Sequence, residues 1–197
     1  MGVMGQRGKG CVMIIPLPRQ HTFNESLARS HEASDLPIWE QIYKASFPNY
    51  LTMVDHRQDG EHQRAGIDRS VILENSKQLL IDEKIRWKDY PDIAVEYLSN
   101  DRTGALGWAC KPLRADYIAY AIAPRGICYL LPVIQLQQAW KIKCQFWIDT
   151  CFKVIAQNNG YRTISAAVPV ADLFMEIGRA LRVNFTAIKD NETVDYA

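Results

Sequence analysis

Five short strand-like segments follow one another between residues 66 and 133, and this run constrains the fold more than any other feature of the sequence. The segments are 66–73, 77–86, 92–99, 115–123 and 126–133. They are rich in β-branched and aromatic residues and are separated by turn formers, which is typical of strands. Strands spaced so closely predict antiparallel neighbours, not the regular strand–helix alternation of a dinucleotide-binding fold.

Helical patterns flank this run on both sides. The first predicted helix begins at Ser34 or Asp35, which can cap it, and ends before Pro48. Residues 49–65 are polar and rich in turn formers, so they predict a surface loop. The C-terminal part predicts a long helix over 134–158 capped by Asn159-Gly160, a strand over 161–170 and a helix over 171–181.

Together these elements predict an α/β (α+β) protein whose mixed β-sheet is flanked by helices on both faces. Residues 34–189 are expected to form a single domain, because a chain of 197 residues suffices for one well-buried core. Residues 1–33 predict a flexible N-terminal arm, since their frequent glycines discourage regular structure. Residues 190–197 predict an acidic C-terminal tail.

The charge balance narrows the class of function. The chain has 23 Lys and Arg against 22 Asp and Glu, a net charge of +1, which argues against histone-like coating of nucleic acid. No apolar run reaches the roughly 18–20 residues that span a bilayer, so no membrane partner is expected. The five cysteines form no CxxC pair, which favours reduced thiols and a cytoplasmic location.

The predicted hairpin of residues 66–86 carries the acids and the lysine that suggest a chemical site. Side chains alternate along a strand, so Asp82 and Lys84 share one face and Glu83 points to the other. If the hairpin loop has three residues, Asp68 lies opposite Asp82. If the loop has two residues, Asp68 lies opposite Glu83, on the wrong face for the lysine. The register therefore decides whether the site exists.

In the three-residue register, Asp68 and Asp82 stand about 5 Å apart at Cβ and repel one another unless a positive charge neutralises them. A hard divalent cation such as Mg²⁺ or Mn²⁺ suits such a pair, because it takes carboxylate oxygens together with waters and substrate phosphate. Lys84 beside them is placed to hold or deprotonate an attacking water, or to stabilise negative charge that develops at phosphorus.

This arrangement resembles the PD-(D/E)XK nuclease superfamily, the restriction-endonuclease-like phosphodiesterases. The family's pattern is an acid in one hairpin strand, then (D/E)-x-K on the next strand, often with a glutamate from the preceding helix. The matching residues are Asp68 in GIDRS, Asp82 and Lys84 in IDEK, and Glu40 in PIWEQIYKA. The resemblance covers roughly residues 34–170, including the long helix and the strand after it.

The resemblance implies a metal-dependent nuclease, an endonuclease or an exonuclease, that hydrolyses phosphodiester bonds and acts on DNA rather than RNA. It implies that Asp68 and Asp82 hold Mg²⁺ or Mn²⁺, that Lys84 acts on the attacking water, and that Glu40 assists the metal or the water. Ile67 stands where the family's pattern has proline, which is a departure.

Basic side chains near the hairpin are candidates for contacts with backbone phosphates. They are Arg69, Arg86 and Lys88. Nothing in their pattern separates DNA from RNA.

Several alternatives are left open. An Asp and a Lys two apart on a strand are also typical of an exposed ion-pair face, so the main alternative is a non-catalytic nucleic-acid or protein-binding module that retains the nuclease fold. A small-molecule phosphoesterase is a third class. Whether Glu83 or Glu96 joins the site is left open, as is the oligomeric state, a homodimer included. His56 and His62 are interpreted as exposed loop side chains.

Overall fold

The computed structural model describes residues 19–22, 37–178 and 180–188. Its strands are β1 (Arg19–Thr22), β2 (Tyr50–Asp55), β3 (Arg69–Leu73), β4 (Gln78–Arg86), β5 (Asp92–Asn100), β6 (Ala105–Leu106), β7 (Tyr117–Ile122), β8 (Ile127–Pro132), β9 (Phe152–Gln157), β10 (Arg162–Pro169) and β11 (Leu181–Asn184). Its helices are α2 (Ile38–Ser46), α3 (Gly60–Arg64), the 3₁₀ helix η1 (Ala123–Arg125), α4 (Val133–Thr150) and α5 (Val170–Ile177).

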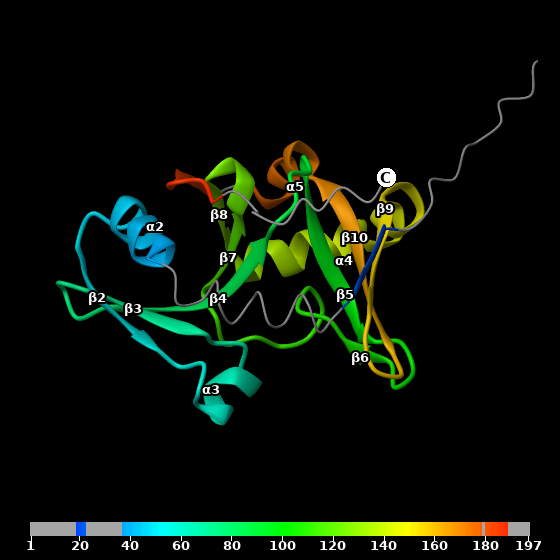
Figure 1. Cartoon of the computed structure of the whole chain (residues 1–197), viewed down its shortest axis with the longest axis horizontal. Coiled ribbons are helices and arrows are strands. Elements are labelled where there is room, and N and C mark those ends of the chain that lie inside the picture. The colour runs from blue at the N-terminus through cyan, green and yellow to red at the C-terminus, as the bar shows by residue number, and fades with distance from the viewer. Residues whose placement is uncertain (1–18, 23–36, 179, 189–197) are drawn as a thin grey trace, which may run out of the picture.

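Within these residues the strands form two hydrogen-bonded sheets (Figure 1). The six-stranded sheet has the order β11-β8-β7-β4-β3-β2, and the five-stranded sheet has the order β1-β9-β10-β5-β6. Both are mixed: β4 runs parallel to β7 and antiparallel to β3, while β9 runs parallel to β1 and antiparallel to β10. The predicted α+β class with mixed pairing is confirmed.

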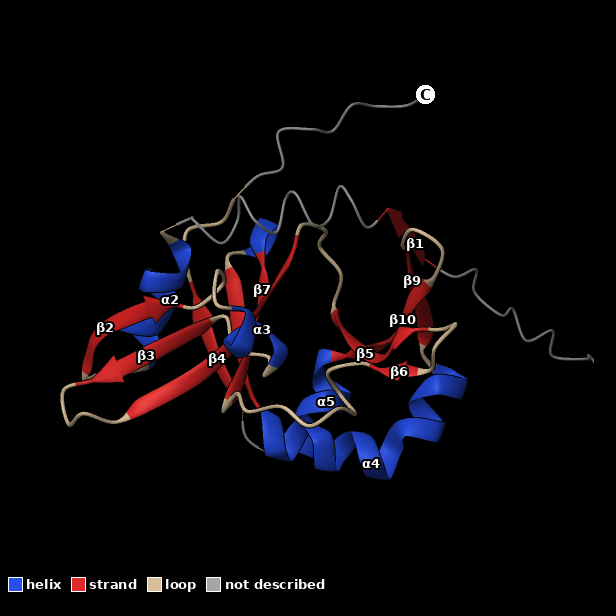
Figure 2. Ribbon diagram, turned by 90° about the horizontal axis from the view of Figure 1, so that it is seen from below, coloured by secondary structure: helices blue, strands red, loops and turns tan. Residues whose placement is uncertain are grey.

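Helices cover both faces of the six-stranded sheet (Figure 2). The apolar side of α2 packs on one face, against side chains of β3, β4, β7 and β8. Helices α4 and α5 pack on the other face, in a second core shared with β5 and β10 of the five-stranded sheet. The second core therefore joins the two sheets, because burial of its apolar surface requires both.

The strands expected in one sheet are thus divided between two. The predicted strand 92–99 becomes β5, which leaves the hairpin sheet and pairs with β10 instead. The pairing joins Val95 to Ala166, which lies 71 residues later in the chain. Periodicity reports which face of a strand is buried and carries no information on so distant a partner.

The predicted helix over 134–158 is too long. Helix α4 ends at Thr150 and Cys151 is extended, with φ −87° and ψ 156°. Strand β9 follows and forms a hairpin with β10, in which Asn158 N–H donates to Tyr161 O (2.9 Å). Asn159 and Gly160 are therefore the two-residue turn of this hairpin, with Gly160 at φ 84°, and not a helix cap.

The predicted loop over 49–65 contains strand β2 and the short helix α3. Strand β2 lies at the edge of its sheet and most of its side chains are exposed, so the alternation that predicts a half-buried strand is absent. Residues 19–22 of the predicted arm form β1, paired with β9. The rest of the arm, 1–18 and 23–33, and the predicted tail over 190–197 lie outside the described residues.

Candidate active site

The hairpin loop between Leu73 and Lys77 has three residues, 74–76, and this is the register that places Asp68 opposite Asp82. Leu73 N–H donates to Lys77 O (2.9 Å) across the loop. Ser76 closes the loop in the left-handed region, at φ 62°, as three-residue hairpin loops require. The pairs further along β3 keep this register. Of the two registers that the sequence left open, the structure has the one that allows a site.

Asp68 stands just before β3, at an irregular point of the ladder. Arg69 pairs with Ile81, yet Asp68 N–H also donates to Ile81 O (2.9 Å). Two residues of one strand thus oppose one residue of the other, as in a β-bulge, and bulges redirect side chains. The Asp68 carboxylate is directed to β4, where its Oδ2 accepts the N–H of Glu83 (2.8 Å).

Asp82 is the buried acid of the site, with 4% of its surface exposed. Burial and, to a smaller degree, the adjacent Asp68 carboxylate raise the pKa of Asp82, and against the opposing effect of Lys84 it stands at about 6. The two carboxylates therefore lie close enough to repel one another electrostatically. A pair of acids in this condition attracts a cation.

Lys84 supplies one cation, because its Nζ forms an ion pair with Asp82. About 35% of the Lys84 side chain is exposed, whereas its partner Asp82 is almost wholly buried. Burial lowers the pKa of Lys84, but the negative charges of Asp82, Asp68 and Glu96 outweigh it and raise this pKa above its ordinary value. The lysine is consequently a firmly protonated ammonium beside three carboxylates.

Glu96 reaches the same cluster from β5 of the other sheet. Burial raises the pKa of the Glu96 carboxyl, while Lys84 and Lys111 act to lower it. The loop after β6 folds over this strand, and Ala109 N–H donates to Glu96 O (3.0 Å). The sequence left open whether Glu96 joins the site; the structure brings it there. The sequence indicates a partly buried acid here, because Glu96 shares its strand face with the apolar residues Ala94 and Leu98.

Glu83 does not join the cluster, because its side chain points to the α2 face of the sheet. Its Oε1 accepts hydrogen bonds from Tyr43 Oη (2.6 Å) and Arg69 Nε (2.7 Å). Burial raises the pKa of Glu83 to about 7, although Arg69 and the Tyr43 hydroxyl act to lower it. The side-chain alternation expected for β4 is therefore observed.

Arg69 is not at the surface where a phosphate contact was predicted. It is 5% exposed and its guanidinium binds the Glu83 carboxylate on the buried side of the sheet. Arg69 pairs with Ile81, whose side chain lies in the core under α2, so the alternation of side chains along β3 places Arg69 on that face too. Arg69 is therefore placed as a structural partner of Glu83.

Glu40 lies away from the cluster, on α2, which packs on the Glu83 face of the sheet. Its carboxylate is about half exposed and pairs with Lys44 one turn later (2.9 Å). The sheet stands between Glu40 and Asp82. The structure therefore does not bring Glu40 to the site at which the family's pattern predicted it.

The two remaining basic candidates differ in their surroundings. Arg86 is largely buried, donates from Nη1 to Asp92 Oδ1 (2.8 Å), and stacks between the rings of Tyr90 and Tyr120. Lys88 is exposed. Of the predicted phosphate contacts, Lys88 alone has an exposed side chain.

Comparisons with known proteins give one match. No protein-family model matches the sequence, and no curated protein matches it. Among solved structures, a restriction endonuclease in complex with substrate DNA matches with a TM-score of 0.40 and 15% sequence identity, over 88% of this chain and 76% of that chain.

Among the described residues, no helix combines the length and the hydropathy that crossing a membrane requires.

Proposed function

We propose that this protein is a metal-dependent nuclease that hydrolyses phosphodiester bonds, with DNA as its substrate. The observation that carries the proposal is the cluster at β4: the Asp68 carboxylate, bound to the N–H of Glu83, is near enough to Asp82 to raise its pKa, and the Lys84 ammonium is paired with Asp82. Glu96 is the third carboxylate near the Lys84 ammonium.

The donor set of this cluster fits a hard divalent cation. Asp68 and Asp82, with Glu96 beside them, offer oxygen ligands only, which are the ligands that Mg²⁺ and Mn²⁺ prefer. Burial raises the pKa of Asp82 and the neighbouring Asp68 carboxylate adds to the effect, so a bound cation would stabilise both carboxylates in their charged form. A cation bound there would polarise the phosphate and lower the pKa of a bound water.

Lys84 acts in this proposal as an electrostatic group. Its raised pKa keeps it protonated at neutral pH, which favours orienting a water and stabilising charge over removing a proton. In hydrolysis a water oxygen attacks phosphorus, one phosphorus–oxygen ester bond breaks, and the oxyanion that leaves takes up a proton. The ammonium is placed to stabilise the negative charge that develops on the phosphoryl oxygens.

Two basic side chains, the half-buried Lys111 and the exposed Lys88, support a polymeric substrate. Lys111 lies near enough to Glu96 to influence its pKa, and Lys88 is exposed beyond the end of β4. Both are available for backbone phosphates, whereas Arg69 and Arg86 are engaged in buried ion pairs.

Cleavage assays with plasmid DNA, single-stranded DNA and RNA, each with Mg²⁺, Mn²⁺ or EDTA, test the proposal. We expect metal-dependent cleavage of DNA, and a loss on the order of 10²-fold or more for Asp82→Asn and for Lys84→Ala. The matched controls are Glu74→Gln and Lys77→Ala, exposed residues of the same hairpin, which should cleave like the parent.

Thermal melts separate the roles of the two residues. Asp82→Asn relieves the repulsion with Asp68, so the metal-free variant should be as stable as the parent or more so, and should lose the stabilisation that Mn²⁺ gives by binding the folded state. Lys84→Ala should slightly lower metal-free stability and keep the Mn²⁺ effect. Full Mn²⁺ stabilisation together with full cleavage in Asp82→Asn would overturn the proposal. Binding without cleavage under every metal would assign the fold to a non-catalytic binding module.

A further inference from the structure

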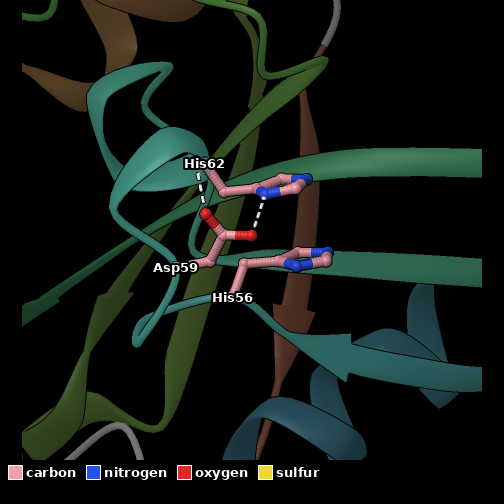
Figure 3. A group of neighbouring side chains, drawn as sticks. All are labelled: His56, Asp59 and His62. Carbon is pink, nitrogen blue, oxygen red and sulfur yellow. Dashed lines mark hydrogen bonds and ion pairs between the residues drawn. The ribbon is translucent and has the colours of Figure 1, made fainter.

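A second group of potential ligands lies outside the carboxylate cluster, where β2 passes into α3. It consists of His56, Asp59 and His62, whose donor atoms all lie within 4.8 Å of one another. The two imidazole rings stack with centroids 4.0 Å apart and planes inclined by 6°. Figure 3 shows the rings side by side with the Asp59 carboxylate next to them.

The His56 ring is held so that one nitrogen is directed to this group. Its Nε2 lies 2.7 Å from the hydroxyl of Ser70, which is fully buried and also accepts a hydrogen bond from Gln78 Nε2 (2.6 Å). In the tautomer that carries its proton on Nε2 and donates it to Ser70, His56 Nδ1 has the free lone pair. Metal-binding histidines are usually oriented by such a hydrogen bond from the other ring nitrogen.

The Asp59 carboxylate is also held in place by hydrogen bonds. Its Oδ1 accepts the backbone N–H of Glu61 (2.9 Å) and of His62 (3.3 Å), and this holds the carboxylate at the start of α3. Its Oδ2 lies 2.8 Å from His62 Nδ1. One oxygen is thus used for positioning, and the other is directed at the histidine pair.

We propose that His56, Asp59 and His62 form a binding site for a borderline transition-metal ion such as Zn²⁺. Two imidazole nitrogens and one carboxylate oxygen are a common zinc donor set, whereas Mg²⁺ prefers oxygen ligands alone. The metal takes the place of the hydrogen that His62 Nδ1 shares with Asp59, and the His62 proton moves to Nε2. Because the rings are parallel, His62 must turn to make the lone pairs converge; its side chain is 36% exposed and free to do so.

The site is connected to the carboxylate cluster through the main chain. His56 N–H donates to Asp68 O (2.8 Å), and Ile67 N–H donates to His62 O (2.9 Å). A metal that joins both histidines would therefore fix the segment that leads into Asp68. Its expected effect is on the stability of this segment, and it does not depend on the nuclease proposal.

Zinc titration of the full chain by calorimetry, with Co²⁺ absorbance as a second probe, tests this site. We expect His62→Ala and His56→Ala each to weaken Zn²⁺ affinity by about tenfold or more, with excess Mg²⁺ unable to compete. The matched control is Glu61→Gln, an exposed acid of the same short helix, which should bind Zn²⁺ like the parent. Circular dichroism of each metal-free variant establishes that it is folded.

Asp82→Asn separates this inference from the proposed function. It should retain Zn²⁺ binding while it loses metal-dependent cleavage. Absence of Zn²⁺ binding in the parent, or equal affinity in His62→Ala and Glu61→Gln, would overturn the zinc site. Neither result would bear on cleavage in Mg²⁺.

Discussion

Asp82 and Glu83 are neighbours in sequence with opposite surroundings. Asp82 faces Asp68 and Lys84, whereas Glu83 faces Tyr43 and Arg69. The strand pattern predicted this separation, since successive side chains of a strand point to opposite faces. It could not predict the partner of Glu83 on α2, because that contact depends on how the helix packs.

At the residue scale, the candidate site was predictable where its residues are local. Asp68, Asp82 and Lys84 belong to one hairpin, so turn length and alternation suffice to place them together. Glu40 and Arg69 were assigned from the family's pattern and from charge, and neither signal reports the face of the sheet on which a side chain lies. Burial of an arginine with a glutamate is a tertiary property.

The first residue-scale prediction concerns the pH dependence of Glu83. Its pKa of about 7 in the native state exceeds the ordinary value of 4.5, so as pH rises between these values the unfolded chain loses this proton before the native protein does. This group therefore contributes less to the free energy of unfolding as pH rises from about 4 to about 7. Glu83→Gln cannot ionise, so its stability relative to the parent should increase across this window, by at most about 3 kcal/mol.

Urea unfolding of parent and variant between pH 4 and 8 measures this difference. Glu74→Gln removes an exposed acid of the same hairpin, and its difference from the parent should stay constant with pH. If Glu83→Gln instead became less stable relative to the parent as pH rises, the ion pair with Arg69 would outweigh burial of the carboxylate.

At the scale of elements, the turn and β4 were predicted to within one residue, although β3 begins three residues later than predicted, at Arg69. The end of helix α4 was not predicted. The apolar residues after Thr150 fit helical spacing as well as they fit a strand, and periodicity alone cannot choose between them. The pairing of β9 with β10 decides the outcome, because it satisfies the backbone groups of both strands around the Asn159-Gly160 turn. Edge strand β2 escaped prediction because its side chains are mostly exposed.

An element-scale prediction follows from the loop that covers Glu96. Gly107 N–H donates to Tyr97 O (3.0 Å), and a Cβ on Gly107 would lie 2.4 Å from Glu96 O, a backbone atom that cannot move aside. Gly107→Ala should therefore displace this loop, lower the stability by about 1–3 kcal/mol, and reduce cleavage by disturbing Glu96. Thermal melts and the cleavage assay measure both effects.

Gly60→Ala is the matched control for this substitution. A Cβ on Gly60 would meet no atom closer than 3.6 Å, so the same chemical change should be tolerated there. Equal stability and activity of Gly107→Ala and the parent would show that the loop is not closely packed on Glu96 and that Glu96 is not positioned by it.

At the scale of the whole molecule, the proposed site depends on the arrangement of two sheets. Lys84 lies on β4 of the six-stranded sheet and Glu96 on β5 of the five-stranded sheet, and the charge of each alters the pKa of the other. The sequence predicted both strands and placed them in one sheet. The division was beyond prediction, because it rests on the long-range pairing of β5 with β10.

A buried ion pair joins the two strands where β4 passes into β5. Arg86 Nη1 donates to Asp92 Oδ1 (2.8 Å) and to Asp92 O (2.6 Å), and the two side chains are 12% and 7% exposed. The guanidinium also stacks on the rings of Tyr90 and Tyr120, at 5.6 and 5.5 Å from their centroids. Removal of one partner of such a pair leaves the other charge buried, which is strongly destabilising.

Arg86→Met should therefore lower the free energy of unfolding by about 3 kcal/mol or more, as measured by urea denaturation. The matched control is Arg162→Met, which breaks an ion pair with Asp101 in which the arginine side chain is about half exposed, and it should cost about 1 kcal/mol or less. The double variant Arg86→Met/Asp92→Asn should recover part of the loss, because the buried carboxylate is then neutral. The contrary outcome is that Arg86→Met unfolds like the parent but binds DNA more weakly, with a shallower dependence of affinity on salt. That result would make Arg86 a phosphate contact, and other residues would then hold β4 and β5 together.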